Sequence, residues 1–406
     1  MMLNRPTFKK SYTVTKTASY IGCAVQAITI NFTPMLFVAF MSEFSLSVEE
    51  LSALVALTFT VQFLIDFISV FLVRRVSYRT LVLMAHAFSC VGFLLMAILP
   101  SLMDAFAGLL IATAVYSSGS GFIEVAVSPI IESCPSKNKA AEMSFLHSFF
   151  CWGQVAAVGL STLFFAFFGV EEWRILTLIW AAVPFFNFFL FVVCPLDLEA
   201  QTNKSRSVRE LLRCREFILL MLIITCSGAA EITVSQWASA YCETALGVSK
   251  TVGDIAGPMA FAVCMGAARA GYAVAGARLK LERCMLVCAI GCVIGYLTVS
   301  LSGVAWLGLI GFCICGLSVG ILWPGAFSLA SRYVDGGGSM YAMLSFSGDA
   351  GCTLGPLLAG MCASYFGDDI GFGILCATVF CAFLCVFTLR FIRVIRKNGK
   401  TVDNGR

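Results

Sequence analysis

The chain has 406 residues, of which 59% are hydrophobic and only 12% are charged, and its formal net charge is +4. Ordinary soluble domains are about half apolar and roughly a quarter charged, so this composition indicates a protein surrounded by lipid. Backbone groups in lipid must bond to one another, and long apolar runs without alternation exclude a barrel, so we expect an all-α polytopic membrane protein. The net charge is too small to indicate an acidic partner, and we expect the lipid bilayer and no nucleic acid as surroundings.

Apolar segments long enough to cross a bilayer, about 20 residues each, follow one another along the chain. Six precede a polar stretch and six follow it, which predicts twelve transmembrane helices in two six-helix bundles. The expected division is an N-terminal bundle over 1–194, a cytoplasmic linker over 195–215 and a C-terminal bundle over 216–406. The predicted spans are residues 17–41, 50–73, 79–100, 104–130, 140–168, 173–194, 216–241, 251–276, 282–302, 304–329, 340–366 and 369–393.

The 19 cysteines and the first apolar run have ordinary explanations in such a protein. The cysteines lie largely inside apolar runs without zinc-type spacing, which is typical of small packing residues. The first run begins near Thr17 and passes Met41, so it is longer than a signal-peptide core, and no small-residue cleavage site follows it. We therefore expect no cleaved targeting segment.

Basic residues fall almost entirely on one side of the predicted spans. Only Arg174 and Lys250 lie on the other side, whose loops are acidic. Since Lys and Arg favour the cytoplasmic side, both termini are expected in the cytoplasm and the protein in the cell membrane. Besides the linker and C-terminal clusters, the basic side holds Arg5, Lys9, Lys10, Lys16, Arg74, Arg75, Arg79, Lys137, Lys139, Arg278, Lys280, Arg283 and Arg332.

The two halves also show a weak internal repeat. A shift of 204 positions aligns Val73–Leu81 with Ala277–Met285 and so places Arg79 on Arg283. The match is short enough to arise by chance. Its position between the second and third spans of each half suits a duplicated six-helix unit, which is found in one large class of transporters.

Six ionisable side chains inside the predicted spans need an explanation, because each costs about 2.5 to 3.5 kcal/mol to insert and so requires a partner, a cavity or a function. Glu124 shares one helical face of the fourth span with Ser117, Ser120 and Ser128, and this polar face is expected to line a cavity. An apolar site favours the neutral form of a carboxyl group, so Glu124 is a candidate proton carrier. A structural hydrogen bond to a neighbouring helix is the alternative. The six are Asp66, Glu124, His147, Glu231, Arg269 and Asp349.

The fifth span places His147 and Gln154 two helical turns apart on one face. His147 is a candidate proton relay, although a packing histidine is an equally simple explanation. The Gln154 amide carries both donors and acceptors, which suits the hydroxyl groups of a sugar.

The first and seventh spans carry polar side chains at similar depths. Glu231 and Gln236 in the seventh span correspond to the level of Gln26 and Asn31 in the first. Amides and carboxylates bind hydroxyl groups, and an indole covers the apolar face of a sugar ring, so we expect a substrate site between the halves. Trp237 has an alternative role as an interfacial anchor. The predicted substrate-binding residues are Gln26, Asn31, Gln154, Glu231, Gln236, Trp237 and Trp323.

Asp66, Arg269 and Asp349 lie with Glu124 and His147 roughly 10 to 14 Å from the cytoplasmic side, at 1.5 Å of rise per residue. Opposite charges in such a layer either form an inner gate that opens and closes or remain permanently paired, and the sequence leaves both open. Walker, metal-cluster and nucleophile-elbow motifs are not found, so we expect no enzymatic activity, no cofactor and no metal site.

The helix pattern, the inside termini and the basic second-to-third loops resemble the major facilitator superfamily across nearly the whole chain. The loop LVRRVSYRT, from Leu72 to Thr80, departs from the usual pattern of that superfamily. The segments GSGFIEVAVSP and SFLHSFFCWGQ, around Glu124 and His147, resemble the fourth and fifth helices of the fucose/galactose/glucose:proton symporter family. That resemblance implies that Glu124 takes part in coupling proton and sugar movement.

The first helix departs from that family, because its segment ITINFTP offers Asn31 and no carboxylate. Glu231 is therefore a candidate second coupling residue beside Glu124 and His147, and sodium coupling or uniport remain alternatives. We expect a secondary transporter that moves a small polar solute, most simply a sugar, by alternating access and proton symport. The alternatives are a proton-coupled exporter of drugs or metabolites, an importer of a nucleoside or organic acid, and a receptor that transports nothing.

Overall fold

The structure, a computed structural model, describes residues 12–46, 48–196, 206–247, 255–276, 279–334, 336–367 and 369–397. These residues form helices and turns and no strand, which confirms the all-α prediction. The first half contains α1 (Thr13–Met35), α2 (Phe37–Phe44), α3 (Val48–Leu72), α4 (Tyr78–Leu102), α5 (Ala105–Ser133), α6 (Lys139–Phe168), the short turn η1 (Val170–Glu172) and α7 (Trp173–Val193). The second half contains α9 (Val208–Leu211), α10 (Arg215–Leu246), η2 (Ile255–Met259), α12 (Ala260–Ala275), α13 (Leu281–Leu301), α14 (Ala305–Val319), α15 (Leu322–Tyr333), α16 (Gly337–Tyr365) and α17 (Ile370–Lys397).

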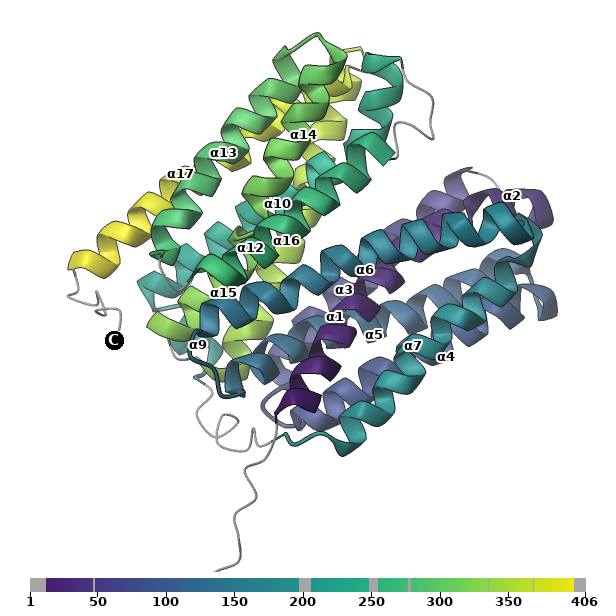
Figure 1. The fold of residues 1–406 in the computed structure, drawn as a ribbon, viewed down its shortest axis with the longest axis horizontal. Helices are drawn as coiled ribbons and strands as arrows, with labels where there is room; N and C mark the ends of the chain where they lie inside the picture. Colours follow the sequence, from purple (N-terminus) through teal and green to yellow (C-terminus); the bar gives the residue numbers. More distant parts are fainter. Residues whose placement is uncertain are drawn as a thin grey trace, which may run out of the picture.

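The helices form two bundles, one from each half of the chain. Figure 1 shows α1–α7 on one side and α10–α17 on the other, with α6 and α12 running side by side between them. Throughout, we call the end at which α1 begins and α17 ends the terminal end, and the opposite end the far end.

Ten candidate spans in the described chain are long and apolar enough to cross a membrane. They correspond to α3, α4, α5, α6, α7, α10, α12, α13, α14 with α15, and α17. The two remaining predicted spans are α1 with α2 and the glycine- and serine-rich α16, which complete the twelve. Both are less apolar because they present polar side chains to the interior between the bundles.

Three predicted spans differ in detail from the helices observed. The first breaks at Leu36, two residues after Pro34, and continues as α2. The tenth breaks between α14 and α15, just before Pro324. The eighth begins with the π-helical turn η2, which contains Pro258. Parts of the predicted linker and several basic residues of the orientation argument lie outside the described residues, namely 197–205, Arg5, Lys9, Lys10, Lys204, Lys250, Arg278, Lys400 and Arg406.

Glycines bring α10 and α16 into close contact. A Cβ atom added at Gly351 would lie 1.9 Å from the carbonyl oxygen of Thr225, and one at Gly228 would lie 2.4 Å from that of Gly348. Only residues without a side chain allow such backbone approach. The contact places Glu231 of α10 and Asp349 of α16 beside the same cavity, which lies between the two halves.

Arg79 joins the start of α4 to the end of α7. Its guanidinium donates to the carbonyl oxygens of Phe191, Val192 and Cys194 at 2.7, 2.9 and 2.8 Å. These carbonyls belong to the last turn and the cap of α7, where intrahelical donors run out and a cation is favourable. The basic loop at the terminal end of the first half therefore has a structural role in its own bundle.

The two bundles contact one another from their middle to the terminal end. Ser331 on α15 donates to the Glu132 carboxylate on α5 at 2.7 Å, and Ser339 on α16 donates to the Val70 carbonyl on α3 at 3.3 Å. Toward the far end, α1, α2, α4, α5 and α7 form a separate apolar cluster within the first bundle, built around Phe32, Phe93 and Trp173. The structure is therefore closed between the bundles at the terminal end.

Candidate functional site

A small cavity of about 80 Å³ lies between the two bundles near their middle. Helices α1, α3, α5 and α6 of the first bundle and α10, α12, α15 and α16 of the second line it. Its volume holds only a few water molecules, at roughly 10 to 15 Å³ each. Its polar or aromatic lining residues are Gln26, Phe59, Gln62, Glu124, His147, Phe150, Glu231, Arg269, Trp323 and Asp349.

A larger pocket of about 590 Å³ adjoins this cavity and shares Phe59 and Cys352 with it. It lies between α3, α10 and α16 and extends to Val55 and Pro356, which belong to the far-end portions of α3 and α16. Its lining is largely apolar, and Gln236 supplies a polar group. A route thus leads from the far end toward the central cavity.

Glu124 lies at the centre of a hydrogen-bonded network in the first bundle. Its Oε2 atom accepts from the Nε2 atoms of Gln26 on α1 and Gln62 on α3, both at 2.7 Å. Ser120, one turn before Glu124 on α5, donates to Gln62 Oε1 at 3.2 Å and so orients the Gln62 amide. Two neutral amides therefore hold a buried carboxyl group whose charge no basic side chain of the described network balances.

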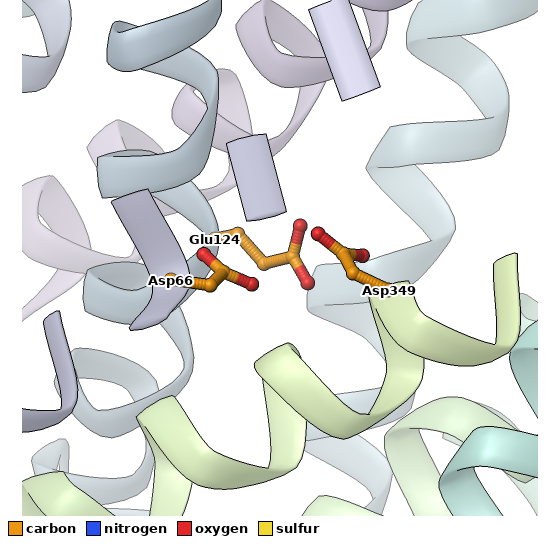
Figure 2. A group of neighbouring side chains, drawn as sticks. All are labelled: Asp66, Glu124 and Asp349. Carbon is orange, nitrogen blue, oxygen red and sulfur yellow. The ribbon is translucent and has the colours of Figure 1, made fainter. Parts of the chain in front are cut away.

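Asp66 and Asp349 complete a group of three carboxyl groups with Glu124. One oxygen of each lies within 4.8 Å of the others, and Figure 2 shows the three side chains pointing toward one another from α3, α5 and α16. Asp66 is fully buried, and neither of its oxygens accepts a hydrogen bond in the part of the chain that the structure describes. Three ionised carboxylates at this spacing in an apolar interior would repel strongly, so protons or a cation must reduce their charge.

Glu231 has a different partner, because it forms an ion pair with Arg269. The Nη2 atom of Arg269 lies 3.1 Å from Glu231 Oε2 and 3.4 Å from Oε1. The same guanidinium donates to the Gly320 carbonyl at 2.9 Å and, across the interface, to the His147 carbonyl at 3.0 Å. The arginine therefore neutralises Glu231 and also joins the second bundle to α6 of the first.

His147 and Trp323 form the aromatic part of the cavity wall. His147 Nε2 lies 3.2 Å from the Ser128 hydroxyl, and its ring stacks on Phe327 with centroids 5.8 Å apart. Trp323 packs directly on Gly348, where an added Cβ would lie 2.2 Å from the indole. Both side chains face the same cavity as Glu124.

Four of the predicted substrate-binding residues do not line the central cavity. The Asn31 amide donates to the Ala27 carbonyl of its own helix at 2.8 Å, and Trp237 donates to the Pro356 carbonyl at 3.4 Å. Gln236 lies on the larger pocket, and Gln154 is half-buried on α6. Among the charged residues, Asp66 and Asp349 gather at Glu124, whereas Arg269 pairs with Glu231.

Gln62, Phe59 and Phe150 line the cavity but were not expected from the sequence. Gln62 had a usable signal, because it precedes Asp66 by four residues and so shares its helical face. The two aromatic residues had none, since phenylalanine is common throughout the apolar segments of this chain.

These features, two six-helix bundles with a polar midplane cavity between them, define the architecture of an alternating-access transporter. The family model for the Major Facilitator Superfamily matches residues 19–356. The chain therefore belongs to the Major Facilitator Superfamily.

Solved structures of sugar:proton symporters share this fold. A variant of the Escherichia coli fucose:proton symporter FucP superposes with a TM-score of 0.80 at 16% identity, covering 94% of this chain and 99% of that one. FucP in the outward conformation gives 0.79, also at 16% identity, with the same two coverages. The proton:xylose symporter XylE bound to 6-bromo-6-deoxy-D-glucose gives 0.81 at 13% identity, covering 93% of this chain and 95% of that one. A search among curated protein sequences found no match.

Proposed function

We propose that this chain is a proton-coupled symporter that brings a small polar solute, most simply a sugar, across the cell membrane. The observation that carries the proposal is Glu124, a buried carboxyl group at the midplane whose Oε2 accepts from two neutral amides. Such a group is able to change its charge within the membrane, as proton coupling requires. The shared fold with FucP and XylE supports sugar as the first class of substrate to test.

In the proposed cycle the terminal end faces the cytoplasm, so the structure corresponds to a state open toward the outside. The contacts of Ser331 with Glu132 and of Ser339 with Val70 close the inner side. The larger pocket gives the solute a path from the far end to the central cavity. There, Gln26 and Gln62 present amides and Trp323 presents an aromatic face to a polyhydroxylated ring.

Glu124 is protonated when solute binds from the outside in this mechanism. Loss of the proton toward the cytoplasm restores the charge, and the amides of Gln26 and Gln62 then pair with the carboxylate instead of the solute. Release follows because the solute loses these contacts. Coupling requires that the two states bind solute with different affinity, since equal affinity moves no equilibrium. Glu231 and His147 remain candidate coupling residues, and Arg269 links both to the same interface.

The test is uptake of a panel of labelled sugars into proteoliposomes under an inward proton gradient, with and without sodium. Accumulation of one sugar that requires the proton gradient and is lost in Glu124→Gln supports the proposal. Facilitated exchange without accumulation in the native protein indicates uniport. Uptake that depends on sodium and not on the proton gradient indicates that sodium is the coupling ion. Full gradient-driven accumulation by Glu124→Gln contradicts the role assigned to Glu124.

The largely apolar lining of the larger pocket favours a second candidate, export of an apolar or amphipathic compound. Val55, Phe59, Phe63 and Leu354 give this pocket an apolar surface that sugar recognition does not require. Accumulation of a fluorescent hydrophobic dye inside inside-out vesicles, with no saturable sugar uptake, would replace the symport proposal with this one.

A further inference from the structure

The interface between α3 and α16 joins the two bundles across the cavity. The rings of Phe63 and Phe346 lie 4.6 Å apart between centroids, and Ser339 bonds to the Val70 carbonyl closer to the terminal end. On α3, Asp66 lies between Phe63 and Val70, and on α16 Asp349 follows Phe346 by one helical turn. An aspartate from each bundle is therefore built into the contact that closes the terminal end.

The surroundings of this aspartate pair do not compensate two negative charges. Asp66 is 0% exposed and both of its oxygens lack a hydrogen-bond donor among the described residues. Ser345, also 0% exposed, lies beside the Glu124 carboxyl group and contributes a neutral hydroxyl without a charge. The carboxyl groups of Glu124 and Asp349 both lie close to Asp66, with one oxygen of each of the three within 4.8 Å of the others.

The other elements packed around the cavity supply no free positive charge to the pair. From α1 and α3, Gln26 and Gln62 donate to Glu124. Glu231 of α10 and Arg269 of α12 neutralise one another. His147 of α6 is hydrogen-bonded to Ser128. Two ionised aspartates would therefore repel across the interface, and no free positive charge among the described residues of the cavity offsets the repulsion. One proton removes that repulsion and at the same time supplies the missing donor.

We propose that Asp66 and Asp349 share one proton, and that this second proton-binding site, distinct from Glu124, holds α3 against α16 and keeps the terminal end closed. Loss of the shared proton leaves two like charges on opposing bundles and drives α3 and α16 apart at that end. The inference rests on the proposed function for its role in the cycle, where it links proton release to opening of the inner gate. It predicts that opening releases a proton in addition to the one carried by Glu124.

The experiment measures the separation of the two bundles at the terminal end against pH, in lipid nanodiscs without any solute. Arg74, just after α3, and Arg332, at the end of α15, are both exposed and lie on different bundles. The 19 native cysteines make thiol labelling unselective. Both arginines are therefore replaced by a ketone-bearing unnatural amino acid, spin-labelled, and the distance distribution is recorded by double electron–electron resonance from pH 5 to pH 9.

The proposal expects one short distance at pH 5 and a growing longer distance as the pH rises. Asp66→Asn and Asp349→Asn each leave a neutral donor facing the remaining carboxyl group, so either variant should keep the short distance at every pH. Glu172→Gln, which removes an exposed carboxyl group at the far end, is the matched control and should behave like the native protein. Thermal unfolding of all four proteins establishes that each is folded.

Three results overturn the proposal. The first is a distance distribution that does not change between pH 5 and pH 9 in the native protein. The second is a pH-dependent opening that persists in both asparagine variants. The third is closure at pH 9 on adding Na⁺ or Ca²⁺ at constant ionic strength, since a cation would then neutralise the carboxyl groups instead of a proton. Because no solute is present, pH-dependent opening without any sugar uptake would refute the substrate assignment and leave the shared proton intact.

Discussion

Two buried glutamates line the same cavity, one from each bundle, and their environments differ completely. Glu124 accepts hydrogen bonds from two neutral amides and lies among other carboxyl groups. Glu231 is paired with Arg269, whose other donors are used by backbone carbonyls. A carboxyl group beside neutral donors has no cation to balance its charge, whereas the charge of one paired with a buried guanidinium is balanced. This comparison supports Glu124 as the coupling group of the proposed function, whereas Glu231 and Arg269 form an ion pair within the second bundle.

The largest expected effect follows from breaking the fixed pair. Arg269→Gln leaves Glu231 charged, buried and without a cation, and removes the link to the His147 carbonyl, so it should destabilise the protein by about 3 to 5 kcal/mol. Thermal unfolding in detergent measures this loss. The double variant Arg269→Gln with Glu231→Gln should recover a large part of it, because no isolated charge remains. A double variant no more stable than Arg269→Gln would show that the backbone contacts of the arginine, and not the ion pair, matter.

The second largest expected effect distinguishes the function of Glu124 from that of Glu231. Glu124→Gln should lower proton-driven accumulation by roughly 5- to 150-fold, the range of typical coupling free energies, while solute exchange at equal pH on both sides continues. Glu231→Gln should instead reduce accumulation and exchange together, because it disturbs Arg269 and the interface. Both fluxes are measured in proteoliposomes with the same labelled solute. If Glu231→Gln lost accumulation but kept solute exchange, the coupling role would belong to Glu231 and not to Glu124.

A smaller effect tests the amides that hold Glu124. Gln62→Leu removes one donor that stabilises the ionised carboxylate, a hydrogen bond worth about 1.5 to 3 kcal/mol because the acceptor is charged. Proton release then requires a more alkaline solution, so the pH of half-maximal uptake should rise by about one unit or more. Ser118→Ala is the matched control, since its hydroxyl bonds to the Ala114 carbonyl of its own helix. An unchanged pH profile in Gln62→Leu would remove this amide from the coupling site.

The smallest effect concerns an exposed ion pair, whose contribution to stability serves as a comparison for that of the buried pair. Glu43 at the far end accepts hydrogen bonds from Arg174 and from the Trp173 indole. Although partial burial opposes ionisation, these partners lower the pKa of Glu43 below its usual value. A lowered pKa in the folded state stabilises the protein above the pKa of the unfolded chain, and this contribution disappears as the pH falls through the folded value.

Glu43→Gln should therefore cost at most about 1 kcal/mol at neutral pH, and the difference from the native protein should vanish in acid. Thermal unfolding between pH 7 and pH 3 measures the difference. A cost at pH 7 equal to that of Arg269→Gln would contradict the distinction between exposed and buried pairs drawn here.

The sequence predicted the helices well and the partners of the buried charges poorly. The predicted span 140–168 corresponds to α6 over Lys139–Phe168, because a run of apolar residues bounded by polar ones fixes both ends of a helix. Helical spacing placed Ser120 and Glu124 on one face, and Glu124 proved to lie in a cavity. Asn31 has the right depth and residue type, yet its amide bonds to its own helix, since depth along a helix does not determine the direction of a side chain.

The sequence by itself determined the class of protein, because apolar segment length, charge asymmetry and the cost of buried ionisable groups are properties of single helices and their loops. It also singled out six buried ionisable residues in the spans, but not His86, which is buried on α4 and bonds to Asn187. Only the tertiary structure decided that Arg269 neutralises Glu231, and that Asp66 and Asp349 gather at Glu124. The reason is physical: these partners lie between 38 and 283 positions apart along the chain, and helix rotation and the meeting of two bundles decide which charges face one another.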